Sequence, residues 1–170
     1  RTNCLYSPSE KLPRGLLLVL MAGVYMTKNN SEAALQSVEK ALQKSPDDVS
    51  ATLMKASILL RQDQASAAVT LLKSSLEKKS DSIPLRTMLA GIYAKTQQTA
   101  EAEALLTSII SLQPHEVQHY KNLALFQVGS NQLDKAEATL REAIQKLPDN
   151  DAAKNNLIDF LVEKRSLTAA

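Results

Sequence analysis

A repeat of 34 residues limits the fold of this chain more than any other feature. Pro114 and Pro148 both end apolar stretches and lie 34 residues apart, and Pro46 lies two such periods before Pro114. Ser80 stands where the series lacks a proline. A repeat of this length is a supersecondary unit that buries its apolar side only by stacking on its neighbours. The sequence therefore predicts a linear series of similar units.

Residues one period apart share size and polarity. Two columns hold small residues, at places where a larger side chain would push packed helices apart: Ala22, Ala56, Ala90 and Ala124, and Ala34, Ala68, Ala102, Ala136 and Ala170. Two others hold large apolar residues: Val38, Leu72, Leu106 and Leu140, and Leu42, Leu76, Ile110 and Ile144. A further column, Tyr25, Leu59, Tyr93 and Leu161, is broken by Gln127. With only 4 Gly and 4% aromatic residues, this pattern predicts helices rather than strands.

Polar segments divide each unit into two helices. Short turns are expected at residues 28–31, 61–64, 96–99 and 129–132. Asp47, Asp81 and Asp149 follow the proline position and are expected to cap the next helix. The predicted hairpins span residues 15–45, 49–79, 83–113 and 117–147, with a single helix at 150–164.

These columns resemble the tetratricopeptide repeat family. The residues that carry the resemblance are Leu18, Met21, Ala22 and Tyr25, and Tyr120, Leu123 and Ala124. It extends from Gly15 to Ala170 and implies an all-α, right-handed superhelix of antiparallel helix hairpins. The sequence departs from the family pattern at Lys55, Gln127 and Ile158.

The resemblance also implies a division of the chain into repeats. Residues 1–14 lie outside the repeat, because Pro8 and Pro13 would break a regular second helix. Four repeats follow at residues 15–48, 49–82, 83–116 and 117–150, and residues 151–170 form a partial fifth repeat or a capping helix. The start at Arg1 and the stop inside a repeat suggest a piece of a longer array.

In this family the first helix of each hairpin lines a concave groove in which a peptide or partner protein docks. Carried over to this sequence, the groove candidates are Val19, Gly23, Met26, Leu53, Ser57, Leu60, Thr87, Gly91, Ala94, Lys121, Leu125, Val128, Asn155 and Asp159. Because this lining is small and apolar with few charges, we expect an apolar or amphipathic ligand. The alternative is a groove covered by further repeats or by another copy of the chain.

The function expected from the resemblance is that of a non-enzymatic scaffold for protein–protein interaction. Arrays of this kind are common in bacterial pilus, secretion and exopolysaccharide-export machinery, and the resemblance does not choose among them. Net charge is +2, with 20 basic and 18 acidic residues spread along the chain. No clustered basic face for nucleic acid is therefore predicted. No cofactor is expected, and the single Cys4 leaves both cytoplasm and periplasm open.

One stretch, Gly15 to Met26, is apolar enough to raise the question of a membrane. It is about half of the ~20 residues that a spanning helix needs. Lys11 and Arg14 precede it as in a signal peptide, but the repeat register favours a helix of the core. No membrane span is predicted.

The sequence His115-Glu116-Val117-Gln118-His119 matches the H-E-x-x-H pattern of zinc metallopeptidases. In that chemistry two histidines on one helical face bind zinc and the glutamate polarises a bound water. The third ligand comes from elsewhere in the chain, and Glu137 or Glu142 is a distant candidate for it. Pro114, directly before His115, favours instead a link between repeats in which both histidines are solvated. A zinc peptidase is the alternative function.

The first predicted helix contains the run Leu16 to Met21, which is apolar on nearly every side. A terminal repeat normally presents a polar outer face. At the other end, Leu157, Leu161 and Val162 are expected to lack a covering helix. We therefore expect the ends to be covered by residues 1–14 or by self-association.

Overall fold

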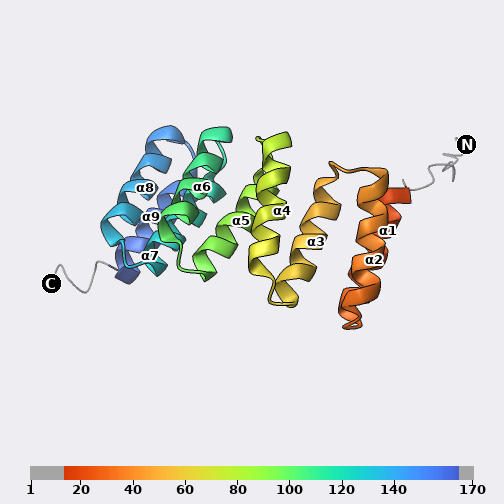
Figure 1. Ribbon diagram of the computed structural model, residues 1–170. Helices are drawn as coiled ribbons and strands as arrows, with labels where there is room; N and C mark the ends of the chain where they lie inside the picture. The colour runs from red at the N-terminus through yellow and green to blue at the C-terminus, as the bar shows by residue number, and fades with distance from the viewer. Residues whose placement is uncertain (1–13, 165–170) are drawn as a thin grey trace, which may run out of the picture. The chain divides into compact units, whose positions relative to one another are not determined.

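The computed structural model describes residues 14–164, and all regular structure within them is helical (Figure 1). The helices are α1 (Arg14–Thr27), α2 (Ser31–Lys44), α3 (Val49–Arg61), α4 (Ala65–Lys78), α5 (Ile83–Lys95), α6 (Thr99–Leu112), α7 (Val117–Gly129), α8 (Leu133–Lys146) and α9 (Asp151–Lys164). Their ends lie within one residue of the expected hairpin limits. The expected all-α fold of helix hairpins is confirmed for the described residues, while the repeat boundaries stay a prediction.

The chain divides into two compact units, residues 1–85 and 86–170. In the first unit α2 packs against α1 and α3, α3 also contacts α1, and α4 packs on α3. In the second unit α6 packs on α7, α8 packs against α7 and α9, and α7 also contacts α9. Helix α5 begins in the first unit and continues into the second. Within each unit, consecutive helices run in opposite directions (Figure 1).

The two alanine columns lie where helices meet. Every described member is buried: Ala22, Ala34, Ala56, Ala68, Ala102 and Ala136 are 0% exposed, and Ala90 and Ala124 are 3% exposed. Val38 and Leu72, from a large apolar column, are also 0% exposed. The small residues let the backbones approach, and the large ones fill the space beside each crossing.

The turn inside each hairpin contains one residue with left-handed backbone conformation. These residues, one period apart, are Asn29, Asp63, Gln97 and Asn131, with φ between 55° and 60°. The next amide in each turn donates to the carbonyl of the fourth residue before the left-handed one, as Asn30 N donates to Tyr25 O at 2.9 Å. This bond ends the first helix in a Schellman motif, which satisfies a carbonyl that would otherwise lack a partner.

The capping residues of the links differ from those expected. Asp47 and Asp149 do not cap: Asp48 Oδ1 accepts from Ala51 N at 2.9 Å, and Asn150 Oδ1 accepts from Ala153 N at 3.2 Å. Asp47 instead pairs with Lys78 at 3.1 Å. Each link is a four-residue turn closed by a backbone bond, such as Asp48 N to Ser45 O at 3.1 Å. Because the proline is the second residue of that turn, the cap falls two positions after it.

The two ends of the array differ from each other. Leu157, expected to lie uncovered, is 8% exposed and packs with Leu140 of α8, whereas Val162 is 61% exposed. In α1 the apolar run is exposed at Leu16, Leu17, Leu20 and Met21, whereas Val19 is buried. Residues 1–13 and 165–170, including Cys4 and Ala170, lie outside the described residues. Within residues 14–164, no helix combines the length and apolar character that a membrane crossing requires.

Replacing Gln97 by glycine should stabilise the protein. Gln97 has a φ of 60°, a conformation that is strained for a residue with a Cβ and free of strain for glycine. The free energy of unfolding should therefore rise by about 0.5–1 kcal/mol. Asn131→Gly is the matched control and should gain less, because asparagine tolerates the left-handed region. Urea unfolding monitored by circular dichroism measures both. A loss of stability in Gln97→Gly would contradict the turn geometry.

Candidate protein-binding groove

The H-E-x-x-H sequence lies in the link before α7. His115 is exposed and precedes the helix, which begins at Val117. Glu116 is the N-cap residue, and its side chain accepts from Gln118 N at 3.5 Å. His119 Nε2 lies 3.0 Å from Gln113 Oε1. The two histidines therefore do not lie one turn apart on a helix, as the zinc motif requires.

Metal-binding geometry is not found around this link. Among residues 14–164, no group of three or more His, Cys, Asp or Glu side chains is placed to hold a metal ion. The link is held instead by Tyr120, which is fully buried and donates its hydroxyl to Pro114 O at 3.1 Å. Burial raises the pKa of the Tyr120 phenol above its ordinary value, and the charge of Glu142 raises it further.

Groove candidates in the first unit lie on α1 and α3 and are partly covered. Val19 is 7% exposed and belongs to the core, so it offers little surface to a ligand. Gly23 and Met26 on α1 are half-buried, and a Cβ placed on Gly23 would lie 3.8 Å from Met54 Cε. The candidates on α3 are also half-buried: Leu53, Ser57 and Leu60.

In the second unit the candidates are more open. Those on α5, α7 and α9 that are exposed are Thr87, Gly91, Ala94, Lys121, Leu125, Asn155 and Asp159, while Val128 is half-buried. Leu125 is 59% exposed, in contrast to the buried Val19. An exposed leucine at this position is available for contact with a partner.

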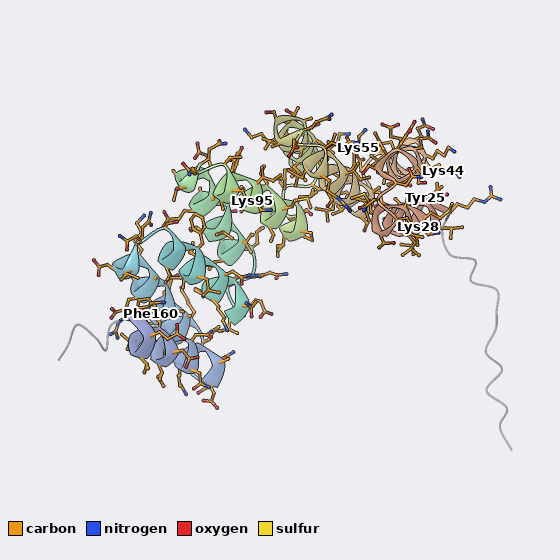
Figure 2. All side chains as sticks on the ribbon, turned by 90° about the horizontal axis from the view of Figure 1, so that it is seen from below. Tyr25, Lys28, Lys44, Lys55, Lys95 and Phe160 are labelled. Atoms are coloured by element: carbon orange, nitrogen blue, oxygen red, sulfur yellow. The ribbon has the colours of Figure 1, made fainter. Side chains whose placement is uncertain are left out.

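A cleft of about 190 Å³ opens between α7 and α9. The sequence-derived candidates that line it are Lys121, Leu125, Val128 and Asp159. It is also lined by residues that the sequence analysis did not select: Ala124, Leu140, Asn156, Phe160, Glu163 and Lys164. Phe160 is labelled on α9 in Figure 2. The cleft thus has an apolar floor and a rim that carries both positive and negative charges.

A buried polar network joins α6, α7 and α8 at the place where the apolar column is broken. Gln127 is 4% exposed. Its Nε2 donates to Glu103 Oε1 at 2.9 Å, and its Oε1 accepts from Thr139 Oγ1 at 2.8 Å. Lys135 Nζ donates to Glu103 Oε2 at 2.9 Å. The side chains of Glu103 on α6 and Thr139 on α8 therefore satisfy both polar atoms of the Gln127 amide, although Gln127 interrupts an apolar column.

The Glu103 carboxylate accepts hydrogen bonds from both Gln127 and Lys135 in this network. Burial acts to raise its pKa, but hydrogen bonds from Gln127 and Lys135 and the positive charge of Lys135 outweigh that effect. The pKa therefore lies below the ordinary value of 4.5. The other departure from the apolar columns, Lys55, is also paired, with Glu39 Oε1 at 3.2 Å.

The fold and the cleft define a helical-repeat protein with an open cleft between α7 and α9. The family model described as Tetratricopeptide repeat matches residues 25–81 and again residues 59–125, which together make up more than half of the chain. The chain therefore belongs to the tetratricopeptide repeat family. Proteins of this family generally mediate protein–protein interactions.

Solved structures share the fold at low sequence identity. Pseudomonas aeruginosa pilF is 17% identical, with a TM-score of 0.66 over 89% of this chain and 69% of that chain. TTC0263, a thermophilic TPR protein of Thermus thermophilus, is 18% identical, with a TM-score of 0.62 over 90% of this chain and 84% of that chain. MamA 41-end from Desulfovibrio magneticus RS-1 is 18% identical, with a TM-score of 0.61 over 89% of this chain and 85% of that chain. No curated protein matches the chain in a sequence search.

Replacing Glu116 by glutamine should change little. The amide oxygen can accept the same capping bond, so the free energy of unfolding should fall by less than about 1 kcal/mol. Thermal unfolding and a peptidase assay with added zinc test this on the parent and the variant. A zinc-dependent activity that the variant lacks would contradict the assignment of His115 to a turn.

Replacing Glu103 by glutamine should cost stability at neutral pH and not in acid. A carboxyl with a lowered pKa in the folded state stabilises that state above the pKa of the unfolded chain. This contribution is lost as pH falls through the folded-state value, which lies below 4.5. We expect Glu103→Gln to lower the free energy of unfolding by about 1 kcal/mol at pH 7, and by much less near pH 3.

The matched control for this prediction is Glu101→Gln. Glu101 is exposed in the first turn of the same helix, so its substitution should have a small effect at either pH. Urea unfolding of the three proteins at both pH values gives the comparison. A loss in Glu103→Gln that is the same at pH 7 and pH 3 would rule out the ionic contribution.

Proposed function

We propose that this protein is a non-enzymatic scaffold that binds an apolar or amphipathic segment of a partner protein on its inner helices. The observation that carries the proposal is the cleft between α7 and α9, where Leu125 is 59% exposed above a floor that includes Phe160. An exposed leucine beside a preformed apolar hollow gives an incoming apolar side chain a place to be buried.

The size of the cleft favours a peptide over a small molecule. Small-molecule sites usually occupy roughly 300–1,000 Å³ and enclose most of the ligand. The cleft here measures about 190 Å³ and is open, which suits a side chain that projects from a longer ligand. The remaining candidates on the inner helices, such as Thr87 and Gly91, would then lie along the path of the backbone.

The charges of the rim favour an amphipathic ligand over a strongly charged one. Lys121 and Lys164 are balanced by Asp159 and Glu163 on the same cleft. A rim with both signs does not attract an acidic or a basic peptide as a whole. It pairs with a segment that carries charges of both signs around an apolar anchor.

A place in a bacterial secretion, pilus or exopolysaccharide-export assembly is the narrower form of this proposal. The resemblance to the family supports it, and the solved structures with the same fold include pilF of Pseudomonas aeruginosa. At 17% identity that likeness concerns the fold. The cleft is the surface through which a component of such an assembly would be held.

Replacing Leu125 by aspartate should remove binding without unfolding the protein. Peptides selected by display on the intact chain should bind Leu125→Asp at least about tenfold more weakly, since the anchor loses its apolar contact. The free energy of unfolding should stay within about 0.5 kcal/mol, because the side chain is exposed. Isothermal calorimetry and urea unfolding measure the two effects.

The matched control is Ile158→Asp. Ile158 lies on α9, is 55% exposed and does not line the cleft. It should leave the affinity of the selected peptides unchanged. Peptides that bind Leu125→Asp as tightly as the parent chain, or a selection that yields no binder, would count against a ligand in this cleft.

A further inference from the structure

The cleft between α7 and α9 carries two charged side chains that no other described side chain neutralises. Lys121 on α7 and Asp159 on α9 both line the cleft, and both are exposed. Neither forms a hydrogen bond or an ion pair with another side chain among residues 14–164. Other charged side chains of the same unit are paired, such as Lys135 with Glu103 at 2.9 Å. Lys121 and Asp159 are therefore open to charged groups of a ligand.

The remaining charges of the rim largely cancel each other. Glu163 and Lys164 are neighbours in sequence, and Lys164 Nζ lies 3.9 Å from Glu163 Oε2. A ligand at that end of the cleft meets both signs at once and gains little from either. The charges that can distinguish one ligand from another are thus Lys121 and Asp159.

The exposure of these positions is a property of the repeat. Helix α7 is packed against α6, α8 and α9, so it has neighbours on both sides along the array. Lys121 and Leu125 nevertheless stay exposed, with 59% of Leu125 accessible. Asp159 stands one period after Leu125, at the same position of its own first helix. Following helices therefore leave this position open, as α8 and α9 do on α7.

The two charges lie at different levels of the cleft. Leu125 follows Lys121 by four residues, which places it on the same face of α7 and about 6 Å further along the helix axis. Because consecutive helices of the unit alternate in direction, α7 and α9 run the same way (Figure 1). Asp159 therefore lies near the level of Leu125, one helical turn beyond Lys121. The positive charge stands at one level, and the negative charge stands beside the apolar anchor at the next.

We propose that this cleft selects a helix of a partner protein by charge as well as by its apolar anchor. Lys121 pairs with an acidic residue of the ligand, and Asp159 pairs with a basic residue about one turn away. This inference rests on the proposed function, since it concerns the ligand of the same cleft. An amphipathic helix presents such an opposite pair on one face at positions i and i+4, next to an apolar side chain that can enter the hollow.

Lys121 and Asp159 act as specificity-determining residues, while Leu125 supplies most of the affinity. Exposed ion pairs contribute little to affinity, but like charges placed together are unfavourable. An acidic peptide gains at Lys121 and is repelled at Asp159, and a basic peptide meets the reverse. Only a ligand with both signs in the right places satisfies both residues.

The probes for this inference are peptides selected from a random display library on the intact chain. Their Kd should rise at least about fivefold for Lys121→Glu and for Asp159→Lys, because each reversal replaces an attraction by a repulsion. Exchanging the acidic residue of a selected peptide for lysine should restore its affinity for Lys121→Glu to within about twofold of the parent pair. Exchanging the basic residue for glutamate should do the same for Asp159→Lys. Calorimetry measures each pair, and recovery also shows that the variant is folded.

The matched control is Lys154→Glu. Lys154 lies on α9, does not line the cleft, and its substitution changes the net charge as much as Lys121→Glu does. It should leave the affinity of the selected peptides unchanged.

Different results separate this inference from the proposed function. Peptides that Leu125→Asp releases, but that bind both charge-reversal variants as tightly as the parent chain, would overturn the inference and leave the proposed function standing. A weakening that no exchange of ligand charge restores would also overturn it, because the variants would then act without pairing to the ligand. A selection that yields no binder would remove the proposed function and this inference together.

Discussion

Close approach of helices at alanine positions is the constraint on which the rest of the structure depends. Ala22 and Ala34 in the first hairpin, and Ala136 in the fourth, have no exposed surface. With only a methyl group at each crossing, two backbones come close enough for the larger side chains beside them to interlock. Val38 and Leu140 then fill the layer that separates successive helices. The left-handed residue in each turn ends the first helix and lets the chain reverse direction into the second.

Two polar residues that break the apolar columns, Lys55 and Gln127, each have a partner on a neighbouring helix. Lys55 meets Glu39, and Gln127 meets both Glu103 and Thr139. A buried amide without a partner would cost more than a hydrogen bond contributes. Sliding one helix past another would break these pairs, so the network favours a single register of α6, α7 and α8. The same pairing lets the array tolerate departures from the apolar columns.

The repeat architecture also accounts for the exposed surfaces within the two units. In a helical repeat each hairpin contacts only its neighbours, so a first helix can keep part of its surface open, as α7 does at Leu125. The cleft at Leu125 is part of that open surface. The face of α1 around Leu20 has a different origin, since it corresponds to the contact surface that α3 and α9 use against the preceding second helix. One surface is thus a groove, and the other is an interface of the repeat itself.

Periodicity and turn chemistry were enough to predict the helices, their ends and the burial of the alanine columns, because both act over a few residues. It did not separate Val19, which is buried, from Leu125, which is exposed, although both occupy groove positions. Nor did it bring Phe160 into the cleft or pair Gln127 with α8. These points depend on the packing of the folded chain, because residues of other helices set the exposure of a side chain and supply the partners of a buried amide.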